Sequence, residues 1–314
     1  MLAISNPDEL LEQNGKLYRL LYTDNEIDQL KIANSLWLDE EYRGEPVLFK
    51  SQYTRNAIDY FYASLFKVDF TQNSTGRAMA QWIAENTDHT LQPEFKPDPE
   101  QIMSIINTIY FRDEWINRFI VEQTQPDTFY LANGQNVTCD FMNKIDVSSE
   151  FSRGDGFTRA ALQLKSQGSM VFILPDENVQ LSKLVSSPAK LRKAFEGGQA
   201  RHGKVTWQIP KFRLDSKLDL VEILQDLGIK SAFSGEADFS GITDHTAFIS
   251  SIIQNTYLAI DEKGVVASAF TKIDYVGASA PEDEAEMILN RPFIYGIYSA
   301  TGHLLFIGIC GNPA

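Results

Sequence analysis

The sequence predicts an α+β fold in which helices come first and strands dominate the rest of the chain. Apolar residues recur at helical spacing before residue 90, whereas short apolar or alternating runs typical of strands follow from residue 102. Helices followed by runs of strands are typical of large mixed sheets. With 314 residues, 43% of them apolar, and no internal repeat or low-complexity linker, we expect a single domain spanning residues 1–314.

The predicted helices are amphipathic. Residues 8–22 place leucines along one side of a helix, and residues 46–66 and 77–86 also show helical spacing of apolar side chains. Residues 218–227 predict a further helix, which ends at Gly228 because glycine readily adopts the left-handed conformation found just after a helix.

The predicted strands begin with residues 30–38. The run IMSIINTIYF at residues 102–111 is almost continuously apolar, which predicts a strand covered on both faces. Later strands are predicted at residues 160–164, 169–174, 203–209, 247–253, 257–261, 293–299 and 304–309.

The charge of the chain argues against two classes of partner. A net charge of -14 and a pI near 4.8 do not suit binding to nucleic acid or to anionic membranes, which needs clustered Lys and Arg. No stretch reaches membrane-spanning length, and residues 1–7 lack the features of a signal peptide. We therefore expect a soluble protein; the compartment is open, and an extracellular one is compatible with the sequence.

The sequence offers no catalytic, metal or cofactor motif. The two cysteines, Cys139 and Cys310, lie too far apart to indicate a disulfide framework or a zinc site. No histidine pair has ligand spacing, and no nucleophile elbow, Walker loop or dinucleotide-binding glycine pattern is present. We therefore predict a protein that is not an enzyme and that holds no metal or cofactor.

One segment near the C-terminus is unusual for a globular domain. Residues 262–292 read EKGVVASAFTKIDYVGASAPEDEAEMILNRP, a long connection whose first half has the period-two pattern of a strand. Burying the six side chains of one face would stabilise a sheet by about 10 kcal/mol. An ordinary strand followed by an acidic loop is the alternative reading of this pattern. The six side chains that would be buried on one face of the strand are Val265, Ala267, Ala269, Thr271, Ile273 and Tyr275.

Short motifs in the same order along nearly the whole chain resemble the serpins. NTIYFRDEW at residues 107–115 resembles the family's central strand, and IDEKG at residues 260–264 resembles its loop hinge. Each motif alone is weak, but their common order makes the resemblance specific. The others are IPKF at residues 209–212, ADFSG at 237–241, RPF at 291–293, FIG at 306–308 and NP at 312–313.

The resemblance implies a fold and a mechanism. The fold has three mixed β-sheets, surrounding helices and an exposed reactive loop at about residues 264–290. A target serine protease would cleave this loop and form an acyl-enzyme, after which the loop would insert into the large sheet and trap the protease covalently. The protein would act as a monomer and a suicide substrate; the alternative is a non-inhibitory serpin-like binding or carrier protein.

The resemblance also implies roles for single residues. The reactive bond would join Ala278 and Ser279, and the small residues before it suit an elastase-like or subtilisin-like protease rather than a trypsin-like one. Lys211 and Glu262 would form a surface ion pair of less than about 1 kcal/mol. The implied loop hinge is Glu262, Gly264, Val265, Ala267, Ala269 and Thr271; the specificity positions are Tyr275, Val276 and Gly277; and the shutter and breach positions are Asn107, Trp115, Lys211 and Gln254.

Three departures from the family pattern stand out. The chain is shorter than usual at its N-terminus, where the family has its first helices and a core strand. Gln254 occupies the place of the family's shutter histidine, and glutamine cannot titrate as histidine does. Phe270 lies in the hinge, where inhibitors favour small residues, although it would project outward if the loop inserted.

Overall fold

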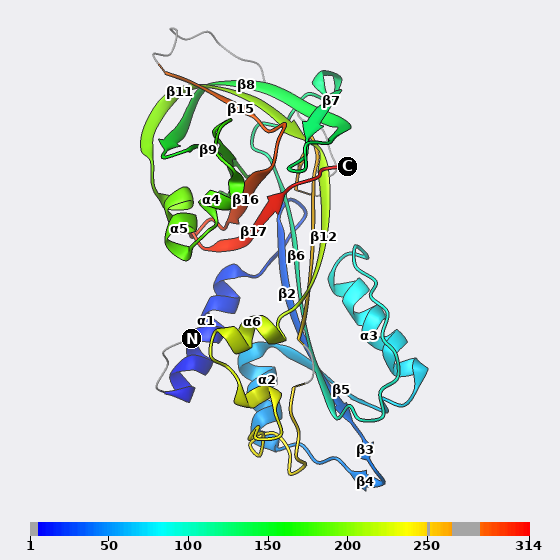
Figure 1. Ribbon diagram of the computed structural model, residues 1–314. Helices are drawn as coiled ribbons and strands as arrows, with labels where there is room; N and C mark the ends of the chain where they lie inside the picture. The colour runs from blue at the N-terminus through cyan, green and yellow to red at the C-terminus, as the bar shows by residue number, and fades with distance from the viewer. Residues whose placement is uncertain (1–5, 250–251, 266–282) are drawn as a thin grey trace. The chain divides into compact units, whose positions relative to one another are not determined.

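The computed structural model describes residues 6–249, 252–265 and 283–314 (Figure 1). They form two compact units. The first contains the residues up to Asp24, Gln29–Tyr110 and Asp215–Tyr257, and the second contains Asn25–Asp28, Phe111–Leu214 and Leu258–Ala314. The single domain expected from the sequence stays a prediction, because compactness does not measure cooperative folding.

The central strands form a seven-stranded mixed sheet. Its strand β5 (Ala63–Val68) pairs in parallel with β2, while β1 and β14 make antiparallel pairs. The sheet order is β1 (Thr23–Asp24), β2 (Gln29–Asp39), β6 (Met103–Glu114), β14 (Gly264–Val265), β13 (Ile253–Ile260) and β12 (Phe212–Asp219).

An eight-stranded mixed sheet makes up much of the second unit. Strand β15 pairs in parallel with β11, β7 (Gln125–Tyr130) pairs with β8, and the other pairs are antiparallel. The order is β15 (Glu284–Ile288), β11 (Gln199–Pro210), β8 (Asn136–Gly154), β9 (Phe157–Gln163), β10 (Ser169–Pro175), β16 (Phe293–Tyr298) and β17 (Leu304–Cys310).

A small antiparallel pair, β3 (Glu41–Tyr42) and β4 (Glu45–Pro46), is the third sheet among the described residues. The helices are capped locally: the Asn6 side chain accepts a hydrogen bond from the Asp8 backbone, and Ser187 does the same for Lys190. The α+β class and the three sheets are confirmed. The described helices are α1 (Pro7–Leu21), α2 (Ser51–Phe61), α3 (Asn73–Asn86), α4 (Leu181–Leu184), α5 (Pro188–Glu196) and α6 (Val221–Asp226), with 3-10 turns η1 (Val121–Gln123) and η2 (Ser231–Phe233).

Two predicted helices were too long. The helix expected at residues 46–66 is only α2, because Tyr62 adopts a left-handed conformation (φ 52°) that ends it. The next residues then pair with β2 as strand β5, with Leu65 opposite Leu36. The helix expected at residues 218–227 begins only at Val221, because β12 continues to Asp219.

Two strand predictions were also wrong. Strand β6 is not covered on both faces, since Ile105 is 61% exposed and Asn107 is exposed as well. The strand expected at residues 247–253 is absent from residues 247–249, and β13 begins at Ile253. Strand β8, 19 residues long, was missed because its alternation of apolar and polar residues is interrupted at Phe141-Met142 and at Ser148-Ser149.

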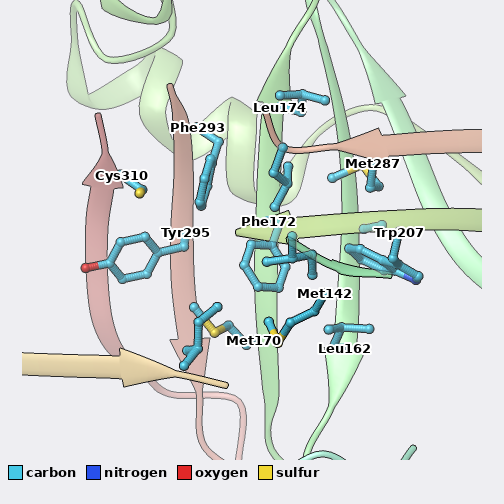
Figure 2. Packing of buried hydrophobic residues seen from close by; sticks show 14 of the residues in the cluster. Met142, Leu162, Met170, Phe172, Leu174, Trp207, Met287, Phe293, Tyr295 and Cys310 are labelled. Atoms are coloured by element: carbon cyan, nitrogen blue, oxygen red, sulfur yellow. The ribbon is translucent and has the colours of Figure 1, made fainter. Parts of the chain in front are cut away.

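Aromatic side chains fill the core of the second unit (Figure 2). Phe172 is fully buried, and its ring centroid lies 5.9 Å from that of Trp207 and 6.1 Å from that of Phe293. Gly308 lets the Tyr295 ring lie over the neighbouring strand, since a Cβ at this position would come within 2.3 Å of the tyrosine oxygen. These contacts join β10, β11, β16 and β17 into one apolar layer.

Truncating the central ring of this core should destabilise the protein strongly. Phe172→Ala would remove the contacts to Trp207 and Phe293 and leave a cavity, which we expect to lower the free energy of unfolding by about 3–5 kcal/mol. Urea denaturation followed by tryptophan fluorescence measures the change. Phe248→Ala is the matched control, because Phe248 is 56% exposed and its loss should cost less than about 0.5 kcal/mol. Equal losses would contradict this account of the core.

Candidate functional site

The hinge expected at residues 260–264 leads into the middle of the central sheet. Strand β14 consists of two residues: Val265 pairs with Asp113 of β6 and with Ile260 of β13, and Gly264 pairs with Glu114. The Val265 side chain is fully buried. The start of the expected loop therefore lies between two central strands, and not along an edge of the sheet.

Glycine is the only residue type that fits at position 264. A Cβ there would lie 2.2 Å from the backbone oxygen of Asp113 and 2.6 Å from the Glu114 Cα, distances that real Cβ atoms do not show. The Asp261 carboxylate accepts hydrogen bonds from the backbone of Lys263 (2.8 Å) and Gly264 (3.2 Å), which closes the turn that leads into β14. Close backbone approach, and not a left-handed conformation, therefore explains the glycine.

Glu262 is held by several donors beside this turn. Its Oε1 accepts a hydrogen bond from Thr124 Oγ1 at 2.8 Å and lies 3.2 Å from Lys211 Nζ. Burial alone would raise the pKa of Glu262, but hydrogen bonds from its own backbone, Thr124 and Lys211 lower the pKa overall. The expectation of a surface pair was wrong for the carboxylate, which is only 8% exposed, whereas the Lys211 side chain is 38% exposed.

Trp115 packs under the same turn. Its ring nitrogen donates to the Asp261 backbone oxygen at 2.9 Å, its backbone nitrogen donates to the Lys263 oxygen at 2.9 Å, and the residue is 1% exposed. The ring also lies edge-on to Phe119, with centroids 6.5 Å apart. Trp115 is thus both a core aromatic and a support for the turn that positions β14.

Two carboxylates at the end of β6 complete the site. Asp113 is fully buried; its Oδ1 accepts from the Glu114 backbone at 2.7 Å, and its Oδ2 has no hydrogen-bond partner. Desolvation raises the pKa of Asp113 to about 6, and the hydrogen bond from the Glu114 backbone opposes this shift only in part. On the other face of the strand, Glu114 forms ion pairs with Arg118 (2.6 Å) and with Lys165.

The pKa of Glu114 is lowered, whereas that of Asp113 is raised. Burial alone would raise the Glu114 pKa, but hydrogen bonds from Lys165 and Arg118 lower it overall. Sequence reasoning missed both carboxylates as site residues. The signal was the charged triplet Arg112-Asp113-Glu114 directly after an apolar run, since charged residues at the end of a largely apolar strand need local partners.

A family model described as serpin (serine protease inhibitor) matches residues 1–313. The chain belongs to the serpin family. Members of this family are generally inhibitors rather than enzymes, in agreement with the lack of catalytic motifs in the sequence. Among the residues that the structure describes, no group of three or more His, Cys, Asp or Glu could hold a metal ion. None of the helices in those residues combines the length and apolarity needed to cross a bilayer.

Curated relatives match most of this serpin. Human serpin B4 is 26% identical over 298 residues, which cover 91% of this chain and 75% of the relative. A serpin-like protein of Methanosarcina acetivorans is 29% identical over 320 residues, with 97% of this chain and 72% of the relative covered.

Solved structures show the same fold. The thermophilic serpin tengpin in its native state superimposes with a TM-score of 0.84 at 26% identity, covering 97% of this chain and 79% of tengpin. Thyroxine-binding globulin, in complex with thyroxine, superimposes with a TM-score of 0.82 at 22% identity, covering 98% and 82%. The second likeness, at this low identity, shows the fold alone.

The expected site residues of this serpin fall into three groups. The first group lies around β14 and the turn before it and comprises Trp115, Lys211, Glu262, Gly264 and Val265. Asn107 and Gln254 lie elsewhere, on β6 and β13, and both are exposed; Asn107 donates to Asn34 Oδ1 of β2 at 2.8 Å. The remaining positions, Ala267, Ala269, Thr271, Tyr275, Val276, Gly277, Ala278 and Ser279, lie outside the described residues.

The buried carboxyl of Asp113 should make stability depend on pH. Its pKa is higher in the folded state, about 6, than in an unfolded chain, so its contribution to stability is fully present below about pH 4 and is lost as the pH rises through 6. Asp113→Asn removes the charge. We expect the free energy of unfolding of the variant at pH 8, measured by urea denaturation, to exceed that of the wild type by up to about 3 kcal/mol.

The comparison is made at each pH between pH 4 and pH 8, because other carboxylates also titrate in this range. The difference between Asp113→Asn and the wild type should shrink towards pH 4, where the aspartate is neutral. Asp140→Asn, at an exposed position of β8, is the control for the loss of one carboxylate at the surface. A difference that is constant with pH would contradict the assignment.

Proposed function

We propose that this serpin is an irreversible suicide-substrate inhibitor of a serine protease with elastase-like or subtilisin-like preference. The position of β14 is the observation that supports it most. Val265 is fully buried between β6 and β13, and it is the first residue of the alternating series that continues with Ala267, Ala269 and Thr271. If the chain continued along the same path, these small side chains would face inward with Val265.

The energetics favour such an insertion once the loop is cut. Burying the five further side chains of the series, up to Tyr275, would contribute on the order of 10 kcal/mol, before hydrogen bonds with the neighbouring strands. This amount equals the whole stability of a typical domain. An intact loop is tied at its far end, where Lys204 donates to the Asp283 backbone oxygen at 2.9 Å and β15 pairs with β11. Cleavage would release this constraint.

We place the reactive bond between Ala278 and Ser279. The residue before the bond and the two preceding ones, Val276 and Gly277, are small, which suits the pocket of an elastase or a subtilisin and not the acidic pocket of a trypsin. The partner would be a serine protease held in a covalent acyl-enzyme complex, with the serpin acting as a monomer. An extracellular setting is compatible with this partner.

A non-inhibitory binding or carrier function is the second candidate. The fold is compatible with this function, since thyroxine-binding globulin, solved in complex with thyroxine, has the same fold. Phe270 also favours it, since a large ring stands where inhibitors have small residues. The two candidates differ in what a protease does to the loop: an inhibitor traps the protease, whereas a binding protein is simply cut.

Mixing the protein with pancreatic elastase or subtilisin tests the proposal. We expect a complex that survives boiling in detergent, because the acyl bond is covalent, and that does not form with protease whose active serine has been sulfonylated. Electrophoresis and mass spectrometry locate the bond. The serpin cut by a trace of protease should also melt well above the intact protein, since the inserted loop adds a strand. Clean cleavage near Ala278 without complex or added heat stability would favour the binding protein.

A charge on the inward face of the loop should convert the inhibitor into a substrate. Thr271→Glu places a carboxylate among Ala267, Ala269 and Ile273, where insertion would bury it at a cost of several kcal/mol. We expect fast cleavage and at least a tenfold loss of covalent complex per molecule cleaved. The matched control is Ser268→Glu, on the outward face, which should retain complex formation. Inhibition unaffected by Thr271→Glu would argue against insertion.

A further inference from the structure

Three consecutive backbone carbonyls in the turn before β14 each accept a hydrogen bond. The Trp115 ring nitrogen donates to the Asp261 oxygen, and the Trp115 backbone nitrogen donates to the Lys263 oxygen, both at 2.9 Å. Between these two, the Phe119 backbone nitrogen donates to the Glu262 oxygen at 2.9 Å. Since a separate donor holds each carbonyl, the turn keeps its shape only while Trp115 and Phe119 keep their places.

These donors belong to one segment, residues 115–124, which we call the clamp. The last residue of the clamp also reaches the turn, since Thr124 Oγ1 donates to Glu262 Oε1 at 2.8 Å. Apart from η1, the described residues of the clamp belong to no helix or strand. Regular backbone pairing therefore does not hold the clamp along most of its length, and contacts from neighbouring elements must fix its position.

Strand β8 supplies three of these contacts. Lys144 Nζ donates to the Asn117 backbone oxygen at 3.1 Å and lies 5.0 Å from the centre of the Phe119 ring. Asn143 Nδ2 donates to the Gln123 backbone oxygen at 2.9 Å. Lys144 therefore binds the middle of the clamp, and one of the two residues that it contacts, Phe119, is the residue whose backbone nitrogen holds the central carbonyl of the turn.

Lys144 is itself fixed within the sheet. Its side chain is only 10% exposed, and Nζ lies 3.3 Å from Asp146 Oδ2, which also accepts a hydrogen bond from the Trp207 ring nitrogen at 2.9 Å. Burial lowers the pKa of Lys144, although the Asp146 carboxylate opposes this shift. Replacing a buried ion pair by apolar residues is often neutral or stabilising, so packing alone does not explain a charged pair at this position. The ammonium group can bind a backbone carbonyl, which an apolar side chain cannot do.

We propose that Lys144 is a positioning residue for the hinge. Through Asn117 and Phe119 it fixes the clamp, and the clamp fixes the turn that directs Val265 into the central sheet. Without the ammonium group, the clamp and the turn open together more often, and β14 separates from β6 more often. The consequence for inhibition rests on the proposed function, since a hinge that opens before cleavage would let the inhibitor lose its activity spontaneously.

Lys144→Met tests the proposal, because methionine keeps an unbranched side chain of similar length and removes the ammonium group. The reporter is the Phe119 backbone amide, whose hydrogen exchange is followed by NMR in deuterated solvent. We expect this amide to exchange about ten times faster in the variant than in the wild type. Exchange in β10 of the same sheet should stay unchanged, and the melting temperature should not fall. A role in overall stability alone would lower the melting temperature and speed exchange in β10 as well, which would contradict the proposal.

The matched control is Lys193→Met on α5, in the same compact unit. Lys193 lies 3.5 Å from Asp155, and neither residue belongs to the clamp or the turn, so exchange at Phe119 should match the wild type. If Lys144→Met does not fold, Lys144→Gln, which also removes the ammonium group, is judged by the same criteria. A Phe119 exchange rate that equals the wild-type rate in the folded variant would overturn the inference.

A second measurement separates this inference from the proposed function. If the wild type forms a covalent complex with pancreatic elastase or subtilisin, Lys144→Met should lose inhibitory activity about five times faster than the wild type during incubation without protease. Equal rates of loss would overturn the role of Lys144 in inhibition. If the wild type forms no covalent complex, the proposed function fails, and the exchange of the Phe119 amide alone decides whether Lys144 positions the hinge.

Discussion

The close approach of the Gly264 backbone to the end of β6 is the constraint on which the rest of the site depends. It lets Val265 enter the central sheet between β6 and β13, which sets the path along which the chain can continue. Trp115 packs against the turn before it, the Asp261 carboxylate closes that turn, and Glu262 is held beside it by its own donors. Each of these groups acts through the geometry of one short hinge, so the hinge is the part of the molecule where a small change has a large effect.

The fold shifts the pKa values of the carboxyl groups around the hinge in different directions. The carboxylates of Glu262 and Glu114 are stabilised by donors that lower their pKa, whereas burial holds the pKa of Asp113 at about 6 with one oxygen lacking a partner. Asp113 therefore stores unfavourable free energy in the native state at neutral pH, at the strand that faces β14.

Much of the fold and part of the site could be predicted from the sequence. The ordered motifs identified the family, and the hinge sequence placed Glu262, Gly264 and Val265 next to Trp115 and Lys211. The element boundaries failed where one pattern fits two structures: residues 62–68 carry apolar side chains that suit a helix or a strand, and pairing with β2 decides the outcome. Period-two alternation in β8 is interrupted at two places and did not stand out before its partners were known.

By itself, the sequence determined the family and the α+β class, because motif order and the spacing of apolar residues are properties of the chain alone. Only the tertiary structure decided that Asp113 is buried beside β14, that Glu262 is shielded while Lys211 is not, and that Lys144 and Asp146 lie inside while Ile145 and Val147 lie outside. Burial depends on which distant strands cover a face, and a desolvated charge is recognisable only once those strands are in place.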